Sequence, residues 1–569
     1  MKTRVRNWAV IIIGTLLALM LLDGMVRLWR TDALKQITIS RQTTYITTPL
    51  ARGGGVNYLA WLNAHLSAGV TPANNAAVLV YEACGAKMFT PGDLRGSGPP
   101  TGTDFILPGM AFSPQKLRRI VAKLAAKPGN PENPFVSYFQ YASRRKWHNR
   151  HLPEAVLTKP WTADEFPHAA AWLKSQGAAL SRVRRAANCA RMYVPVIREG
   201  ELPVSTALWV DFSQATEIVG NAILSRALLR AGSGNIKGAW NDIDAVHKLS
   251  LLFDQGPFPN IRLIGIRTDS VAMQVIQSMA RSERLSAAQA LRCLHRMQRW
   301  QSPPSPAAVY DVGYRMMHLA LLQKWARQGG FYPWAKNHFI DAFIPINYNA
   351  VMTRLNRICN ELTTASGLAD YRLAQAGQIA IGSKFRVTFH LSPWMSERRV
   401  TKMIVGTSMA TAVGDELKFI TMEKAEKTLT ETSLALAAYH AAHHCYPQSL
   451  GDLVPAYLPA VLRNPFDGKP LHFCANLKKS GYLLYYFSSL PGDHGKPYHD
   501  EEEIVSVHWS NPAPRPFMGL PYPPMSPAEA ADFPGEGPVT CKCKNGPAKN
   551  GKGTGASTKP SRAATRPAK

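Results

Sequence analysis

Paired histidines near the end of a predicted helix form the first group that could do chemistry. His440 and His444 are four residues apart in YHAAHHCY, a spacing that places both imidazoles on one helical face, and Cys445 follows them. Imidazole and thiolate groups are ligands of zinc. The chain lacks the HExxH pattern that gives zinc proteases their general base. The alternative is a structural role, because the last turn of a helix favours a partial positive charge.

Ser408 lies in GTSMA, which resembles the serine-bearing segment of subtilisin-like proteases. In those enzymes this serine is the nucleophile, and it needs a histidine base and an orienting acid. The matching DTG-like and HGTH-like segments are absent upstream. The segment therefore indicates a helix N-terminus. A metal-dependent or serine hydrolase in an unrecognised arrangement of Ser408, His440 and His444 remains an alternative function.

Basic residues are the third candidate group. The chain has a formal net charge of +28, and SRVRRAANCARMY carries Arg182, Arg184, Arg185 and Arg191 in a predicted helix. Such a surface can contact phosphates, or it can be a solvated face. A second alternative function is therefore an anionic-surface binder, of nucleic acid or lipid, that uses the basic tail. No groove-reading motif accompanies these arginines, so we expect no nucleic acid partner.

The elements that must position these groups are mostly helices. Apolar periodicity, caps and breakers predict helices at 211–231, 236–254, 259–281, from Ser286 with a capping box to Gln289, at 306–328 and at 415–443. The turns between them are short, so neighbours should be antiparallel, as in an α-solenoid or an irregular bundle. In the last helix one face should be formed by Ala425, Leu429, Thr432, Leu436 and Tyr439. Nearer the N-terminus, TPANNAAVLVYEACG predicts a helix capped by Thr71.

The N-terminus predicts a membrane anchor. Trp8 and Trp29 bracket 22 residues that begin WAVIIIGTLLALMLL, and Lys2, Arg4 and Arg6 precede them. At about 1.5 Å per residue this segment would cross a bilayer, with a tryptophan at each interface. A cleaved signal peptide is the alternative, but no cleavage site follows. We expect a single-pass inner-membrane protein whose N-terminus is cytoplasmic and whose bulk is extracytoplasmic.

After the last helix the pattern becomes β-rich. PLHFC, GYLLYYFSS and EIVSVHW predict a three-stranded antiparallel sheet that packs on the helix. The export of this region would permit a disulfide between Cys445 and Cys474. The predicted fold class is mainly α, with a small α+β module. The predicted division is 1–30 anchor, 31–164 mixed region with a Gly/Pro-rich loop, 165–410 helical-hairpin domain, 411–510 α+β module and 511–569 disordered basic tail.

The segment CYPQSLGDLVPAYLPAVLRNPFDGKPLHF, followed by YLLYYFSSLPGDHG, resembles the C-terminal domain of type II secretion major pseudopilins over residues 415–510. It also resembles a set of uncharacterised membrane-anchored bacterial proteins that end in this module. For that set the similarity extends to TTYITTPLARGGGVNYLAWLNAHL and to ALLRAGSGNIKGAWNDIDAVHKL. The chain lacks the Gly-Phe cleavage point and the glutamate of a pseudopilin, so we expect no assembly into a pilus.

The pseudopilin resemblance implies a calcium site. Such domains often bind calcium in the loop after the second long strand, which matches SLPGDHGKPYHDEEE here. Asp493, Asp500 and Glu501 would supply the oxygen ligands that calcium prefers. A solvated acidic loop is the alternative. No other cofactor is expected.

The anchor, the helical array and the terminal module together predict a membrane-anchored extracytoplasmic scaffold, or a secretion- or envelope-associated interaction protein. We expect it to contact the membrane through residues 8–29 and to bind a protein partner in the cell envelope. No set of residues in the sequence forms a recognisable catalytic constellation.

Overall fold

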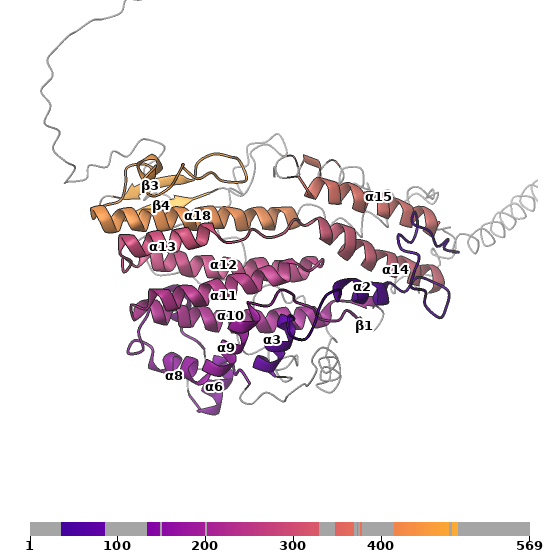
Figure 1. The fold of residues 1–569 in the computed structure, drawn as a ribbon, viewed down its shortest axis with the longest axis horizontal. Coiled ribbons are helices and arrows are strands. Elements are labelled where there is room, and N and C mark those ends of the chain that lie inside the picture. Colours follow the sequence, from indigo (N-terminus) through magenta and orange to yellow (C-terminus); the bar gives the residue numbers. More distant parts are fainter. Residues whose placement is uncertain are drawn as a thin grey trace, which may run out of the picture.

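The structure is a computed structural model, and it is mainly helical (Figure 1). It describes residues 36–85, 134–147, 151–199, 202–328, 347–368, 373, 376–377, 380, 415–476 and 481–486. Within these ranges no helix has both the length and the apolar character needed to cross a bilayer. The predicted anchor at residues 8–29 lies outside them, as does the tail from residue 511.

Short helices and one hairpin form the first part of the described chain. They are α2 (Tyr58–Leu66), α3 (Ala76–Cys84), α6 (Tyr138–Arg144), α7 (Ala155–Thr158), α8 (Pro167–Ser175), α9 (Gly177–Ala186), β1 (Ile197–Glu199) and β2 (Leu202–Ser205). β1 and β2 pair antiparallel, with Ile197 opposite Ser205. The prediction that Thr71 caps a helix was wrong. α3 begins at Ala76 because Asn75 caps it, accepting a hydrogen bond from the backbone N–H of Ala77 at 3.1 Å.

Consecutive long helices form the stack at the centre of the molecule (Figure 1). They are α10 (Ala207–Gly232), α11 (Ile236–Asp254), α12 (Pro259–Arg281) and α13 (Ala287–Gln298). Turns of a few residues join them, so successive helices run antiparallel and bury apolar faces against each other. The predicted bounds of α11 and α12 are confirmed, and so is the capping box between Ser286 and Gln289. α10 begins four residues earlier than predicted, at Ala207.

α18 (Asp415–His443) is far along the chain but packs against α12 and α13. Its predicted apolar face is buried at Ala425, Leu429, Thr432 and Leu436, whereas Tyr439 is only half-buried. The opposite side of the same helix is also buried at Leu434 and Ala438. The reason is that α18 lies between the helical stack and the module that follows it (Figure 1).

The module contains the short 3-10 helix η4 (Leu450–Leu453) and the strands β3 (His472–Asn476) and β4 (Gly481–Tyr485). β3 and β4 pair antiparallel, with Cys474 opposite Leu483. A two-stranded sheet is therefore present beside α18, and the third predicted strand, EIVSVHW, lies outside the described residues. Cys445 and Cys474, which export would permit to form a disulfide, are both in the thiol form in the structure.

The segment that follows the predicted anchor packs on another pair of helices. α14 (Arg315–Gln328) continues the π-helix η2 (Val309–Tyr314), and α15 (Tyr348–Ser366) packs beside both. Asn356 donates from Nδ2 to the carbonyl oxygens of Gln42 and Thr43, at 2.9 and 2.8 Å. The guanidinium of Arg315 lies 4.0 Å from the centroid of the Tyr45 ring. These contacts fix residues 36–45 at the α14–α15 end of the molecule.

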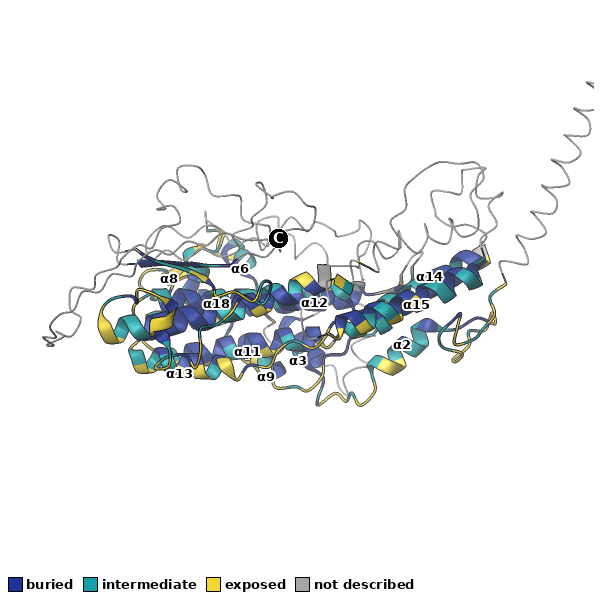
Figure 2. Cartoon of the chain, turned by 90° about the horizontal axis from the view of Figure 1, so that it is seen from above, coloured by how far each residue is buried: buried dark blue, intermediate teal, exposed yellow. Residues whose placement is uncertain are grey.

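The described residues share one hydrophobic core, which runs from Val56 to Tyr486 in the sequence. Figure 2 shows the buried residues concentrated along α12, α18 and the inner faces of the neighbouring helices. In Figures 1 and 2 alike, α14 and α15 extend away from the stack toward one end. How the chain divides into domains stays a prediction.

Candidate anion-binding site

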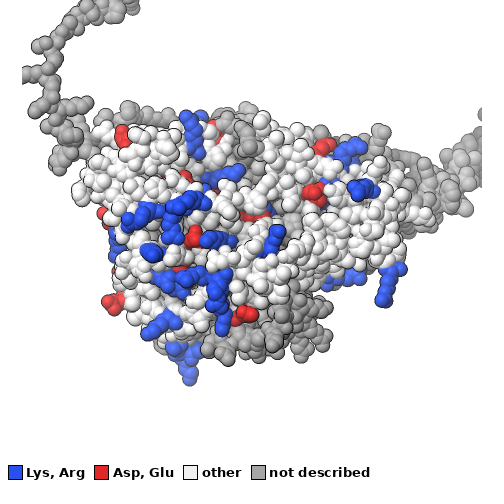
Figure 3. Space-filling view, viewed as in Figure 1, with Lys and Arg blue, Asp and Glu red and all other residues white. Residues whose placement is uncertain are grey.

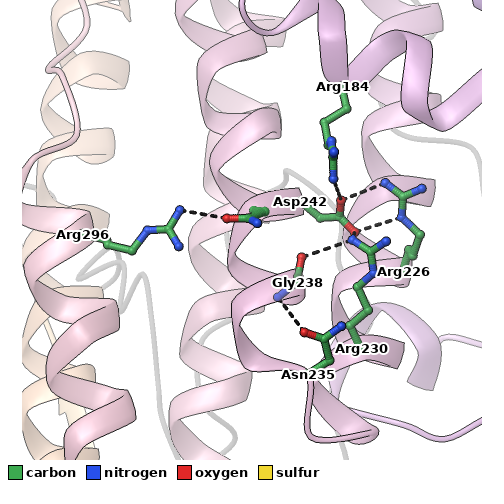
Figure 4. Close-up of polar contacts among 8 residues, drawn as sticks. Arg184, Arg226, Arg230, Asn235, Gly238, Asp242 and Arg296 are labelled. Carbon is green, nitrogen blue, oxygen red and sulfur yellow. Dashed lines mark hydrogen bonds and ion pairs between the residues drawn. The ribbon is translucent and has the colours of Figure 1, made fainter.

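A buried carboxylate surrounded by arginines lies in the helical stack. Asp242 lies in the second turn of α11, and its side chain has no exposed surface. Arg226 binds it side-on, with Nε 2.9 Å from Oδ2 and Nη2 2.8 Å from Oδ1. Arg230 donates from Nη1 to Oδ2 at 2.7 Å, and Arg184 places Nη1 3.9 Å from Oδ1. We call these three arginines the arginine cluster (Figure 4).

The spacing of the helices explains why these side chains meet. Arg226 and Arg230 are four residues apart on α10, so they lie on one face, and this face packs on α11. Arg184 comes from the last turn of α9, which packs against both α10 and α11. A charge on the interior side of α11 is tolerated because the arginines supply ionised donors to both carboxylate oxygens.

The arginine cluster holds more positive than negative charge. Three guanidinium groups surround one carboxylate, which leaves a formal surplus of two positive charges. The surplus is open to solvent, because the side chains of Arg184 and Arg230 are 46% and 30% exposed, whereas that of Arg226 is 12% exposed. Burial lowers the pKa of Arg230, Asp242 opposes this, and the charges of Arg226 and Arg184 lower it further. Arginine still remains ionised at neutral pH.

The beginning of α11 completes the surroundings of the cluster. Asn235 caps the helix by accepting a hydrogen bond from the backbone N–H of Gly238 at 2.9 Å. Gly238 has no room for a side chain, since a Cβ there would lie 2.7 Å from Nδ2 of Asn235. The carbonyl oxygen of Gly238 in turn accepts a hydrogen bond from Nη1 of Arg230 at 3.2 Å. The first turn of α11 therefore helps to hold Arg230 in place.

Arg296 of α13 extends the positive surface across α11. Its Nη2 donates to Oδ1 of Asn241 at 3.1 Å, and its guanidinium lies 5.6 Å from the Trp240 ring centroid. Figure 4 shows Arg296 on the side of α11 opposite Arg226 and Arg230. We call the arginine cluster together with Arg296 the arginine face. Figure 3 shows Lys and Arg side chains gathered over this part of the stack, with few acids between them.

A second polar group lies inside the stack, between α11, α12 and α18. Nδ1 of His247 lies 2.8 Å from Oδ1 of Asp269, and its ring stacks on Trp300 with centroids 3.9 Å apart. Glu423 of α18 is 3% exposed and shares a hydrogen bond with Asp269. Asp254 and Arg262 complete this group, which we call the buried acid cluster.

The buried acid cluster holds its helices together but is closed to substrates. Burial raises the pKa of Glu423 well above its usual range, and the charges of Asp254 and Asp269 raise it further. The shift favours the protonated form of Glu423, which can donate its proton to Asp269. Within the described residues no group of three or more Asp, Glu, His or Cys side chains could hold a metal ion. The paired His247 and Asp269 are two members of a triad-like arrangement, but both are buried.

One turn further along α18, Glu426 accepts a hydrogen bond from Nε2 of Gln277 at 3.1 Å. Burial raises the pKa of Glu426 to about 7, and hydrogen bonds from Gln277 and Tyr486 oppose the shift. Gln277 also donates to the hydroxyl of Thr430 at 2.8 Å. α12, α18 and the end of β4 are thus linked by polar contacts as well as by apolar packing.

The structure separates the histidines that the sequence paired. α18 ends at His443, and His444 leaves the helix with a φ of 56°. The ring of His440 stacks on Tyr446 with centroids 4.4 Å apart, and His443 Nε2 lies 3.1 Å from the Tyr457 hydroxyl. These contacts fit the structural alternative.

Other predicted site residues lie outside the described part of the chain. They are Ser408, Asp493, Asp500 and Glu501. The hydrolase alternative and the calcium loop therefore stay predictions. Of the four arginines in SRVRRAANCARMY, three lie in α9, but Arg191 lies beyond it and hydrogen-bonds to Asn74 through its backbone.

Sequence reasoning found Arg184 but missed Asp242, Arg226 and Arg230. The sequence did contain a signal for a charged pair between neighbouring helices. Arg226 and Arg230 are four residues apart in one predicted helix, and Asp242 lies close to the apolar Trp240 in the next. The signal identifies charged residues near a helix interface but does not show that they meet.

Comparison with known proteins adds no relative. The chain matches no protein-family model, no curated protein and no solved structure.

Proposed function

We propose that the protein is a membrane-anchored, non-enzymatic scaffold of the cell envelope, and that its helical stack binds an acidic protein partner at the arginine face. The observation that carries this proposal is the arrangement of Arg184, Arg226 and Arg230 around the buried Asp242, with Arg296 continuing the positive charge across α11. Rigid helices hold these cations, so a partner finds them already positioned.

Charge complementarity is the physical basis of the proposed binding. A positive surface attracts acidic partners from a distance and fixes their orientation on contact. Arginine is suited to this role, because its planar guanidinium binds carboxylates side-on, as Arg226 binds Asp242. The sequence predicts a protein partner, and the arginine face is the surface at which we propose that this partner binds.

The contacts of the N-terminal segment support one orientation of the molecule relative to the membrane. Residues 30–35 alone separate the predicted span from residue 36, where the described chain begins on α15. Nδ2 of Asn349 in α15 donates to the carbonyl oxygen of Gln36 at 2.8 Å, and its Oδ1 accepts from the N–H of Thr38 at 2.9 Å. The α14–α15 end would therefore face the membrane, and the stack with the arginine face would project from it (Figure 1).

Site-specific crosslinking in cells tests the partner. Lys237 is exposed in the first turn of α11, so a photo-crosslinking amino acid there reports on the arginine face. We expect an adduct in the envelope fraction that falls at least tenfold in the double variant Arg184→Glu, Arg296→Glu, and that weakens as salt rises.

Reversal of an exposed cation outside the arginine face is the matched control. Arg52→Glu should leave the adduct within twofold of the unmodified chain, since Arg52 lies in the N-terminal segment. An adduct that survives the double reversal would show that the arginine face is not the binding surface. Protease protection of a tag after Lys569 separately tests the extracytoplasmic location, because a protected tag places the bulk in the cytoplasm.

A further inference from the structure

We infer that the arginine cluster is a built binding site for a phosphoryl dianion, such as inorganic phosphate or a phosphate monoester. The inference goes beyond the scaffold function, because such a site works without a protein partner. The charge count, the orientation of the donors and the architecture that holds them all favour such a ligand.

The charge count identifies a dianion. Asp242 neutralises one of the three guanidinium charges, so the cluster carries a surplus of two. A phosphate monoester carries a charge of about −1.5 to −2 at pH 7. Such a ligand brings the site close to neutrality, whereas a single carboxylate leaves one positive charge in a partly buried place.

The donors that Asp242 leaves unused point to the same ligand. Arg226 uses Nε and Nη2 on Asp242, and Arg230 uses Nη1 on Asp242 and on the Gly238 carbonyl. Arg184 contacts Asp242 only at 3.9 Å, beyond hydrogen-bond distance. The other N–H groups of these three residues have no hydrogen-bond partner among the residues that the structure describes. Guanidinium groups match the geometry of phosphate oxygens and bind them in pairs.

The architecture shows that the arginines are held in place before a ligand arrives. Asp242 is fully buried and fixes Arg226 and Arg230 in one arrangement. Arg184 and Arg230 reach the surface, so a ligand can approach them without opening the core. The Gly238 carbonyl oxygen, in the first turn of α11, accepts a further hydrogen bond from Arg230 and helps to hold it.

Titration calorimetry on the full-length protein in a neutral detergent tests the inference. Inorganic phosphate should bind saturably at pH 8 and at least fivefold more weakly at pH 5.5, because the dianion becomes protonated with a pKa of about 6 to 7. Sulfate stays a dianion over this range, so its affinity should change less than twofold. Nitrate at matched ionic strength, as a monoanion, should not saturate.

Variants of the exposed arginines assign the binding to the cluster. Arg184→Gln and Arg230→Gln should each weaken phosphate binding at least tenfold. Lys248→Gln is the matched control, because Lys248 is a cation on α11 with the same 46% exposure, and it should stay within twofold. Arg226 is left intact, since its removal would leave Asp242 without its principal partner. Circular dichroism of each variant checks that the helices remain folded.

Two probes distinguish the source of the phosphoryl group. Dihexanoyl phosphatidic acid, below its micellar concentration, presents a lipid headgroup, and dihexanoyl phosphatidylcholine is its control. Tighter binding of the phosphatidic acid than of inorganic phosphate assigns the site to a lipid headgroup, and the reverse order assigns it to a soluble phosphate. Absence of binding by both probes up to 20-fold above physiological phosphate, or binding that Arg184→Gln and Arg230→Gln leave unchanged, overturns the inference. Because no partner protein takes part, a failure here is separate from a failure of the crosslinking experiment.

Discussion

Asp242 and Arg226 meet side-on between α10 and α11, with both carboxylate oxygens within 2.9 Å of guanidinium nitrogens. The pair fixes the register of the two helices, because a shift of either helix by one turn would separate both hydrogen bonds. It also means that the arginine cluster depends on a residue that solvent does not reach.

Removal of the carboxylate should therefore be costly. Asp242→Ala leaves Arg226 and Arg230 close together without their counter-ion, and we expect the free energy of unfolding to fall by about 3–5 kcal/mol. Asp242→Asn should lower the free energy of unfolding by less than Asp242→Ala does, since the amide oxygen still accepts hydrogen bonds. Chemical denaturation followed by circular dichroism measures both. Asp164→Ala, at an exposed position, should change the value by less than about 0.5 kcal/mol.

The raised pKa of Glu423 predicts a stability that falls with pH. The folded protein binds the Glu423 proton more tightly than the unfolded chain does, so stability is greatest below the ordinary carboxyl pKa of about 4.5. It is lost progressively as the pH rises toward the folded-state pKa. Glu423→Gln keeps an N–H donor for Asp269 and carries no charge. Its denaturation midpoint should exceed that of the unmodified protein at pH 8 and depend less on pH. Equal pH dependence in both proteins would contradict the raised pKa of Glu423.

Glu426 makes a second pH-dependent contribution to the free energy of unfolding, over a narrower pH range. Its pKa rises to about 7 on folding, so its contribution is present below about pH 4.5 and is lost as the pH passes through 7. The difference corresponds to a few kcal/mol at most, on the order of 3. Glu426→Gln retains the acceptor for Gln277, and it should remove the part of the pH dependence between 5 and 7. Thermal unfolding scans at pH 5, 6, 7 and 8 separate this variant from Glu423→Gln, which changes the slope at higher pH.

Close backbone packing at Gly313 predicts a strong effect of a single methyl group. A Cβ at this position of η2 would overlap the carbonyl oxygen of Pro257, in the turn between α11 and α12. Gly313→Ala should lower the free energy of unfolding by about 3 kcal/mol or more, because the obstacle is backbone and cannot rotate away. Gly177→Ala is the control. No atom lies within 4 Å of its added Cβ, and a helix gains up to about 1 kcal/mol from alanine. An unaffected Gly313→Ala would show that η2 can move away from that turn.

Burial divides the cysteines of the described residues into two chemical classes. It raises the pKa of Cys84 and Cys359 to about 12 and that of Cys293 to about 11. Thiolate is the reactive form, so these three should resist alkylation at pH 8 until the protein unfolds. Cys189, Cys445 and Cys474 are partly exposed and should react first. Mass spectrometry of iodoacetamide-treated protein gives the order. Absence of label on Cys445 and Cys474 alone, restored by a reductant, would show that they form a disulfide in the cell.

Long periodic helices are the part of the fold that sequence predicts well. α11, α12 and α18 have their predicted bounds because caps, breakers and apolar spacing agree along each segment. The start of α3 was missed because Thr71 and Asn75 are both good caps. Asn75 is the actual one, since its side chain also bonds both backbone groups of Tyr193, 118 positions away. The local sequence around Asn75 does not predict its contact with Tyr193.

The candidate site also depends on contacts between segments far apart in the chain, which the local sequence does not predict. Arg184 could be noticed because it stands in a basic run, but its counter-ion lies on another helix. Glu423 is a polar residue of α18, and the local sequence does not predict that it is buried. Its burial follows from α18 lying between the stack and the β3–β4 sheet, which is a tertiary arrangement. Hydrophobic periodicity identifies one apolar face, and it therefore underestimates the buried surface of a helix that is covered on two sides.

The position of α18 has a consequence for the order of folding. α12 ends at Arg281, but the helix that covers it begins at Asp415, so the surface around Asp269 and Gln277 waits for the last third of the chain. Contacts between such distant segments form late and slow the whole process. During synthesis, the α12 surface is therefore uncovered while the first helices are already complete. A chain interrupted before residue 415 would expose this surface permanently, and it would be a substrate for chaperones and proteases rather than a smaller version of the same protein.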